Sequence, residues 1–309
     1  MSAPIAAVAG ATGFVGRRLC GRLVERGWSV RSLVRTAPLA GDWLASATTT
    51  VQGDLSDVEA LRRLAEGARV CINSAGLVKA GSPAAFKAVN AVGAGRFAAI
   101  GDARHILISS LAAREPQLSA YAASKQAGEI AARAAAGGRL AVLRPPVIYG
   151  PGDRETLALF RFAQRSPIAP VPADRRARLA LTHVEEVVDA ALALIERPEL
   201  GGVYAVGGHR PDGYSWVEIA KAAWGALGRN ARIVTVPAWA VRAAGLATDS
   251  LAGGRPAIFG RGKAAEILHP DWAIGSEEVM PSAPTPQFDL RAGFADAVAW
   301  YRRAGWLGP

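Results

Sequence analysis

Tyr121 and Lys125 are the residues whose types and spacing point most directly to chemistry. They stand four residues apart at the start of a segment with helical periodicity, residues 121–136, so both side chains point to one face. A phenol has a pKa of about 10, and an adjacent ammonium group brings that pKa toward the neutral range. The pair therefore predicts a general acid, Tyr121, tuned by Lys125.

Two neighbouring hydroxyls, Ser109 and Ser110, come at the end of a predicted strand over residues 105–109. Active sites of open α/β sheets collect at the carboxyl ends of the strands, so either serine can orient a substrate oxygen beside Tyr121. The twin serines leave the choice between them open. Tyr and Lys at this spacing are common on helix surfaces. A catalytic role for Tyr121 and Lys125 is therefore predicted only in combination with the motifs that precede them in the sequence.

The first of these motifs is a glycine loop, Gly10, Gly13 and Gly16, between a predicted strand over 5–9 and a predicted helix over 17–26. Glycine in this strand–turn–helix position lets the backbone turn sharply and approach a pyrophosphate at the helix N-terminus. The loop predicts a dinucleotide site. Three more residues of the loop are expected to contact the cofactor: Thr12, Phe14 and Val15.

The end of the second predicted strand, residues 29–34, indicates which dinucleotide binds. An acidic residue there would hydrogen-bond the adenosine ribose of NAD, but Arg35 follows the strand instead. Arginine suits a ribose phosphate, so NADPH or NADP is the expected cofactor in preference to NAD. Arg17 is placed to help, although either arginine also fits a solvated surface position.

Further cofactor contacts are expected after the next two strands. Asp54, with Leu55 beside it, is placed to hold the adenine edge; a turn or helix-capping role is the alternative for this aspartate. Small residues after the following strand let the cofactor pass closely over the sheet: Ser74, Ala75 and Gly76. Tyr121 and Lys125 are expected to contact the nicotinamide end of the cofactor, where Lys125 can hold the ribose.

Strands and helices alternate through the first half of the chain, which is typical of a parallel sheet with helices on both faces. The fold class is therefore α/β, a Rossmann-type doubly wound parallel sheet with a smaller C-terminal substrate domain. We expect an NADP(H)-binding domain at 1–145, with a returning segment near 180–206, and a mainly substrate-binding domain at 146–309. The expected strands are 5–9, 29–34, 49–52, 70–73, 105–109 and 140–144; the expected helices are 17–26, 57–66, 86–99, 121–136, 184–196 and 215–226.

The net charge of +10 favours anionic partners such as phosphates, acidic substrates, nucleic acid or membrane surfaces. Nucleic acid is not expected, because no aromatic-laced basic motif or zinc-finger spacing occurs. Cys20 and Cys71 lie far apart, which indicates neither a disulfide framework nor a metal site and fits a reducing cytoplasm. The start lacks a signal peptide's basic region, and no apolar run of about 18 residues occurs, so a cytoplasmic protein is expected.

A basic segment, residues 229–263, carries six Arg or Lys against one acidic residue, Asp249. One interpretation is a solvated surface. The other is peripheral contact with an anionic membrane, at the inner face of the cell membrane. No feature of the sequence specifies an oligomeric state. Large apolar residues in this segment include Trp239, Leu246, Leu251 and Phe259.

Five motifs, in this order, resemble extended short-chain dehydrogenases: residues 10–16 (GATGFVG), 53–55 (GDL), 108–110 (ISS), 121–125 (YAASK) and 144–153 (RPPVIYGPGD). The resemblance spans most of the chain. It implies a Rossmann domain that binds NAD(P), a Ser/Tyr/Lys catalytic set, and a loop beside the nicotinamide. That loop contains Pro145, Val147 and Ile148, and the resemblance implies a structural role for His183.

The interval between serine and tyrosine, 11 or 12 residues, narrows this resemblance. It is shorter than in many nucleotide-sugar epimerases and dehydratases. It is similar to an atypical branch that includes a complex I accessory subunit and bacterial reductases of sphingolipid synthesis; residues 262–272 look like that branch too. The resemblance implies NADPH-dependent reduction of a hydrophobic, lipid ketone such as keto-sphinganine or keto-ceramide. A nucleotide-sugar epimerase or dehydratase is the alternative enzyme, and a non-catalytic NADP(H)-binding structural subunit is the other alternative.

Overall fold

The computed structural model describes residues 2–37, 42–197, 201–252, 259–281 and 283–308. They form two compact units. The first contains Met1–Arg144 and Val188–Tyr204, and the second contains Pro145–Val187, Ala205–Gly253 and Ala257–Pro309. The first boundary between the two units falls after Arg144, one residue before the end of the predicted cofactor-binding domain at 145.

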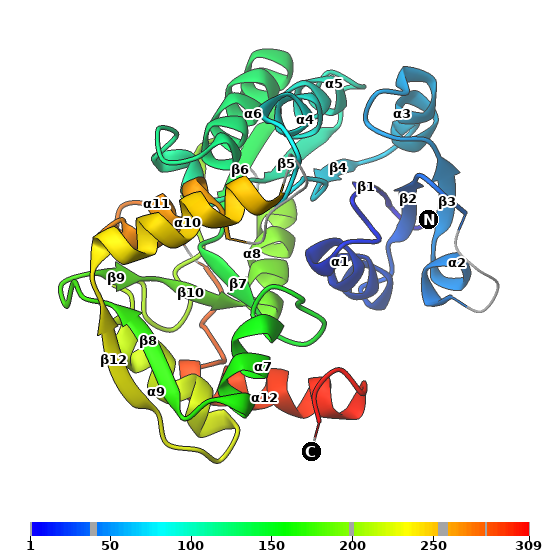
Figure 1. The fold of residues 1–309 in the computed structure, drawn as a ribbon. Coiled ribbons are helices and arrows are strands. Elements are labelled where there is room, and N and C mark those ends of the chain that lie inside the picture. Colours follow the sequence, from blue (N-terminus) through cyan, green and yellow to red (C-terminus); the bar gives the residue numbers. More distant parts are fainter. Residues whose placement is uncertain (1, 38–41, 198–200, 253–258, 282, 309) are drawn as a thin grey trace. The chain divides into compact units, whose positions relative to one another are not determined.

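A seven-stranded sheet organises the first unit (Figure 1). Its order is β11-β6-β5-β4-β1-β2-β3, and the neighbouring pairs from β6 to β3 are parallel. Dinucleotide-binding doubly wound sheets have this order, so the predicted fold class is confirmed. The strands are β1 (Ile5–Ala9), β2 (Ser29–Val34), β3 (Thr49–Gln52), β4 (Val70–Asn73), β5 (Arg104–Ile108), β6 (Leu140–Arg144) and β11 (Val203–Ala205).

Helices cover both faces of this sheet, with α3 to α6 on one side and α1 and α8 on the other (Figure 1). The central strands are buried; Ala6, Val8 and Ile72, for example, have no exposed surface. The helices are α1 (Phe14–Glu25), α2 (Trp43–Ala47), α3 (Val58–Ala65), α4 (Pro83–Phe86), the π-helix η1 (Lys87–Gly93), α5 (Ala94–Ala98), the 3₁₀ helix η2 (Leu111–Arg114), α6 (Ala120–Ala136), the 3₁₀ helix η3 (Gly137–Arg139) and α8 (Val184–Glu196).

Two helices of the first unit differ from expectation for local reasons. Helix α1 begins three residues before the predicted 17, because Gly13 is its N-cap and the end of the glycine loop is already helical. The predicted helix over 86–99 is interrupted by η1, a π-helical segment. Periodicity does not distinguish π from α geometry over so short a stretch, and such segments are frequent at functional sites.

The second unit has a core of aromatic side chains from several helices, including Phe160, Trp224, Phe294 and Tyr301. Of its helices the sequence predicted only 215–226. Among the helices described, none is both long and apolar enough to cross a membrane. The elements are β7 (Val147–Tyr149), α7 (Leu157–Arg165), β8 (Ile168–Pro172), β9 (Arg178–Leu179), β10 (Leu181–His183), α9 (Trp216–Ala226), β12 (Arg232–Val236), α10 (Ala238–Ala252), α11 (Arg261–Leu268), β13 (Asp271–Trp272) and α12 (Leu290–Arg303).

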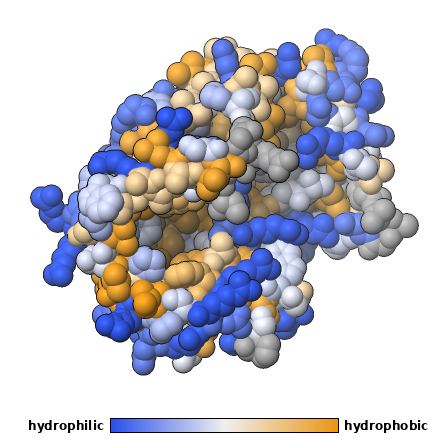
Figure 2. Space-filling view, viewed as in Figure 1, coloured by the Kyte–Doolittle hydropathy of each residue, from blue (hydrophilic) through white to orange (hydrophobic). Residues whose placement is uncertain are grey.

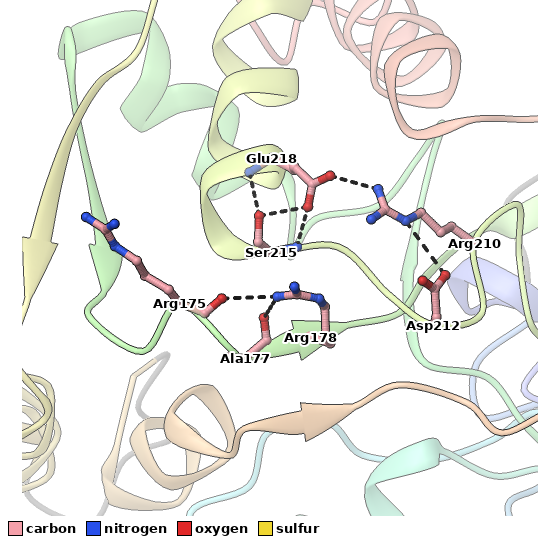
Figure 3. Close-up of polar contacts among 7 residues, drawn as sticks. All are labelled: Arg175, Ala177, Arg178, Arg210, Asp212, Ser215 and Glu218. Carbon is pink, nitrogen blue, oxygen red and sulfur yellow. Dashed lines mark hydrogen bonds and ion pairs between the residues drawn. The ribbon is translucent and has the colours of Figure 1, made fainter.

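A polar cluster fixes the start of α9 (Figure 3). Ser215 and Glu218 form a capping box, in which each side chain bonds the other residue's backbone N–H. Arg210 donates to Glu218 at 2.7 Å. Burial alone would raise the pKa of Glu218, but the hydrogen bonds from Ser215 and Arg210 outweigh it and lower the pKa to about 2. The contacts of Glu218 and Arg210 therefore stabilise the start of α9.

Candidate active site

The glycine loop lies at the carboxyl end of β1 and has no room for a side chain at Gly10 or Gly16. A Cβ at Gly16 would stand 2.1 Å from the carbonyl oxygen of Gly10. A Cβ at Gly10 would stand 2.5 Å from the backbone nitrogen of Ala75, and the φ of Gly10 is +82°. The loop is therefore packed directly against the backbone that follows β4.

The N-terminus of α1 opens from this loop. Gly13 caps the helix, Phe14 and Val15 begin its first turn, and that turn contains no acidic side chain. Thr12 and Gly13 are exposed. Unpaired backbone N–H groups and the positive end of the helix dipole favour an anion at such a position. The closely packed glycines of the loop and this helix end together fit the pyrophosphate of a dinucleotide.

The small residues after β4 are held in place by specific hydrogen bonds. Ser74 Oγ donates to the carbonyl oxygen of Ala9 at 3.0 Å, and the N–H of Ala75 donates to Asn73 Oδ1 at 3.0 Å. A Cβ on Gly76 would stand 3.7 Å from Lys125 Nζ. The structure therefore brings the glycine loop, residues 74–76 and Lys125 together.

Arg35 and Asp54 lie together at the ends of β2 and β3. Arg35 is exposed and directly follows β2, and Gly53 donates to the carbonyl oxygen of Val34 at 3.0 Å. Hydrogen bonds from Ser56 lower the pKa of the Asp54 carboxyl, and the Arg35 guanidinium adds to this effect. Asp54 thus makes the hydrogen bonds of a turn, and its predicted contact with the adenine edge stays a prediction.

The two neighbouring predicted residues have different surroundings. Leu55 is buried, and a Cβ on Gly93 would stand 2.8 Å from its Cδ1, so Leu55 packs against η1. Arg17 donates to Asp42 at 3.2 Å. Because Arg17 already has a carboxylate partner, Arg35 is the better placed of the two arginines to meet a phosphate.

Tyr121 and Lys125 lie on the first two turns of α6. The Tyr121 ring is half-buried, with its centroid 6.1 Å from that of Phe86. Lys125 is buried, and its Nζ donates to the carbonyl oxygen of Ile108 at 3.0 Å. Burial lowers the pKa of Lys125 to about 8, and the Glu129 carboxylate opposes this shift. The lysine is therefore mainly an ammonium at neutral pH, anchored to the residue before the twin serines.

The twin serines have different hydrogen bonds. Ser109 is buried, and its hydroxyl donates to Glu129 Oε1 at 2.5 Å. Ser110 is half-buried; its Oγ accepts from the N–H of Ala112 at 3.2 Å and, within the described residues, makes no other hydrogen bond. The hydroxyl proton of Ser109 is thus already used in a hydrogen bond to Glu129, whereas that of Ser110 is available to a ligand.

Glu129 and Arg144 are functional candidates that the sequence reasoning missed. Arg144 and Glu129 form a bidentate ion pair, with Nε–Oε1 at 2.9 Å and Nη2–Oε2 at 2.6 Å. Glu129 follows Lys125 by four residues, so Tyr121, Lys125 and Glu129 lie along one face of α6. That spacing was visible in the sequence, but the contact with Arg144 depends on the packing of α6 against β6.

Asn90, in the π-helical segment η1, is a second missed residue. Its side chain donates to Ser124 Oγ at 2.9 Å and to the carbonyl oxygen of Leu77 at 2.9 Å, and it accepts from the N–H of Leu77 at 2.7 Å. A Cβ on Gly128 would stand 2.1 Å from the carbonyl oxygen of Asn90, so η1 and α6 are in close contact. Asn90 thereby joins the segment after β4 to the helix that carries Tyr121 and Lys125.

The loop residues that the resemblance implied lie in the second unit. Val147 and Ile148 belong to β7, which pairs with β10, and Pro145 precedes that strand. These three contacts remain predictions. His183 is buried in β10 and stacks on Phe288 at 3.9 Å between ring centroids.

Comparison with known proteins places this site in a family. Residues 6–207 match the NAD dependent epimerase/dehydratase family. The chain belongs to this family. The predicted resemblance to extended short-chain dehydrogenases is thereby confirmed, and the matched range contains the glycine loop, the twin serines, Tyr121 and Lys125.

Within the epimerase/dehydratase family, one relative is similar over nearly its whole length. The ceramide reductase of Caulobacter vibrioides is 45% identical over 308 residues, which cover 98% of this chain and 96% of that protein.

Solved structures of the family share the fold. The UDP-glucose 4-epimerase of Thermus thermophilus, solved with NAD, has a TM-score of 0.72 at 19% identity and matches 97% of this chain and 99% of its own. The dTDP-glucose 4,6-dehydratase of Bacillus anthracis, also solved with NAD, has a TM-score of 0.71 at 16% identity and 98% coverage of both chains. At these identities the likeness concerns the fold.

Proposed function

We propose that this chain is an NADPH-dependent oxidoreductase that reduces the ketone of a long-chain lipid, such as a keto-ceramide or a keto-sphinganine. The observation that carries the substrate class is the 45% identity to the ceramide reductase over 98% of this chain. The site itself supports reduction, because the phenol, the ammonium and a hydroxyl with an available proton lie at one edge of a dinucleotide-type sheet.

The described residues fit the cofactor. The glycine loop and the N-terminus of α1 would hold the pyrophosphate, Ser74–Gly76 would border its path, and Arg35 would meet the ribose phosphate. Asp54 and Leu55 would lie on the adenine side. When bound, NADPH supplies the hydride that the carbonyl carbon receives.

The chain's own groups handle the proton. Ser110 donates a hydrogen bond that orients the carbonyl oxygen, and Tyr121 Oη transfers its proton to that oxygen as the alcohol forms. The Lys125 ammonium stabilises the phenolate left on Tyr121 until solvent returns a proton. One ketone, one NADPH and one proton thus give one alcohol and one NADP⁺.

The test is NADPH oxidation by the purified protein with a keto-ceramide, a keto-sphinganine, a steroid ketone and a nucleotide sugar. Turnover confined to the long-chain keto lipids supports the proposal. A tightly held, non-exchanging NAD and turnover of the nucleotide sugar would instead establish the epimerase or dehydratase alternative. Tight NADPH binding with no turnover of any compound would favour the structural-subunit alternative.

Replacing Arg35 with alanine is expected to raise the KM for NADPH about tenfold or more and to change the KM for NADH little. A hydrogen-bonded charge contact contributes about 1.5–3 kcal/mol, and each 1.4 kcal/mol is a factor of about ten. Steady-state kinetics with both cofactors measures the difference. Arg26→Ala, which removes an exposed arginine paired with Glu196, is the matched control. Equal losses for NADPH and NADH in Arg35→Ala would contradict the ribose-phosphate contact.

A further inference from the structure

Helix α10, in the second unit, exposes large apolar side chains along one face. The exposed fractions are 71% for Trp239, 50% for Leu246 and 88% for Leu251. Exposed alanines, Ala243 and Ala247, lie on the same side of the helix. Single exposed apolar residues are ordinary, but a continuous face of them marks an interaction site.

The opposite side of α10 is packed, so the direction of this face is set by the fold. Val241 and Gly245 are buried, and a Cβ on Gly245 would stand 3.0 Å from Ala264 Cβ on α11. Asp249 accepts hydrogen bonds from the N–H of Arg261 at 3.0 Å and from its Nε at 3.2 Å. The helix is therefore fastened to α11, and its apolar face cannot turn inward without breaking these contacts.

The strand pair β8–β12, which precedes α10 in this unit, also exposes apolar side chains. Ile168 pairs with Arg232 and Pro170 with Val234, and all four residues are exposed, whereas the alternate residues of β8 are buried. Strand β12 leads into α10 (Figure 1). Apolar atoms run along α10 on the side shown in Figure 2. We call the exposed apolar residues of the helix, Trp239, Leu246 and Leu251, the α10 surface.

The chain segment that leads into α10 and carries the α10 surface has charges of one sign. Arg242 is exposed on α10 and Arg232 on β12, and residues 229–248 contain no Asp or Glu. The next acidic residue, Asp249, is the one bonded to Arg261. Arg255 of the basic segment lies outside the described residues. Exposed Trp and Leu combined with arginines and no carboxylates match a bilayer with anionic headgroups, where apolar side chains enter the interface and arginines meet phosphates.

We propose that the α10 surface docks this chain onto an anionic phospholipid membrane. The exposed residues and charges support this docking independently of the proposed function. The proposed function adds a reason for it, because the ketones of long-chain lipids reside in bilayers and a docked enzyme meets them there.

The test is co-sedimentation with vesicles of phosphatidylcholine alone and of mixed phosphatidylcholine and phosphatidylglycerol. The unaltered protein is expected to bind the mixed vesicles far better, and less well at high salt, because salt screens the arginine–headgroup attraction. The double variant Trp239→Ser, Leu246→Ser is expected to bind at least about tenfold more weakly, because it removes two apolar side chains from the interface. Ile130→Ser, which alters a side chain 65% exposed on α6, is the matched control and should bind normally.

Three results would overturn the proposal. The first is no sedimentation of the unaltered protein with mixed vesicles at low salt, and the second is equal vesicle binding by the double variant and Ile130→Ser. The third is the absence of vesicle binding together with concentration-dependent dimers that the double variant abolishes. The last would assign the surface to a second copy of the chain. Turnover of a water-soluble short-chain ketone, measured without vesicles, should be the same in the double variant. If no ketone is reduced by any form of the protein, the proposed function fails, while the vesicle result still decides the docking.

Discussion

Replacing Tyr121 with phenylalanine is expected to lower NADPH-dependent ketone reduction by about 100- to 10,000-fold, the range that general acid catalysis contributes. The variant loses one oxygen and keeps the ring that packs beside Phe86. In the proposed function the glycine loop and Arg35 hold most of the cofactor, so the Kd for NADPH should change little. Single-turnover rates and NADPH fluorescence titration measure the two quantities separately.

Tyr204→Phe provides the matched control, since Tyr204 donates to the carbonyl oxygen of Gly201, remote in sequence from the site. That variant should keep normal turnover. A Tyr121→Phe protein with near-normal turnover of a confirmed substrate would show that another group donates the proton.

Replacing Glu129 with glutamine is expected to move the alkaline limb of the pH–rate profile for reduction to lower pH by about one unit or more. Reduction needs a protonated Tyr121 and a charged Lys125, and the pKa of Lys125 is held at about 8 by burial against the opposing carboxylate of Glu129. The rate of the unaltered enzyme should therefore fall as pH rises through about 8. Removing the negative charge of Glu129 lowers the pKa of Lys125, so the fall begins at lower pH.

The pH profile separates this charge effect from a structural one. A merely structural defect lowers the rate at every pH and leaves the limb where it was. Glu59→Gln, which alters an exposed ion pair with Arg62, is the matched control. A direct readout is also available: the side-chain NMR signal of Lys125, identified by its loss in Lys125→Arg, should titrate at lower pH in Glu129→Gln. An unmoved limb together with an unmoved Lys125 titration would refute the role given to Glu129.

Glu129→Ala tests the same network through stability. It leaves the Arg144 guanidinium, with a side chain only 20% exposed, without its carboxylate partner. Breaking such a pair costs about 3–5 kcal/mol, and urea unfolding should show a loss of that order. Glutamine keeps one oxygen that can accept from Ser109 Oγ and from Arg144 Nε, so its loss should be smaller.

The order of strands and helices in the first unit could be predicted because it depends on local patterns. Short apolar runs bounded by turns gave β4 (Val70–Asn73) and β6 (Leu140–Arg144) at their observed bounds. The second unit could not be predicted in the same way. Its helices α7, α10, α11 and α12 follow proline-rich or basic stretches, and the aromatic core that stabilises α7 and α12 joins residues far apart in sequence.

The sequence by itself determined the family, the fold class and the types of group available, because glycine spacing, the Tyr/Lys interval and the alternation of elements are local properties. Only the tertiary structure decided what each group touches. The twin serines are chemically identical in the sequence, and they differ because α6 places Glu129 against Ser109 and not against Ser110. Glu129, the negative charge near Lys125, is likewise paired with Arg144 at the end of β6. This contact forms only when α6 packs against the sheet. Hydrogen bonds and ion pairs between distant segments depend on packing, which no spacing along the chain expresses.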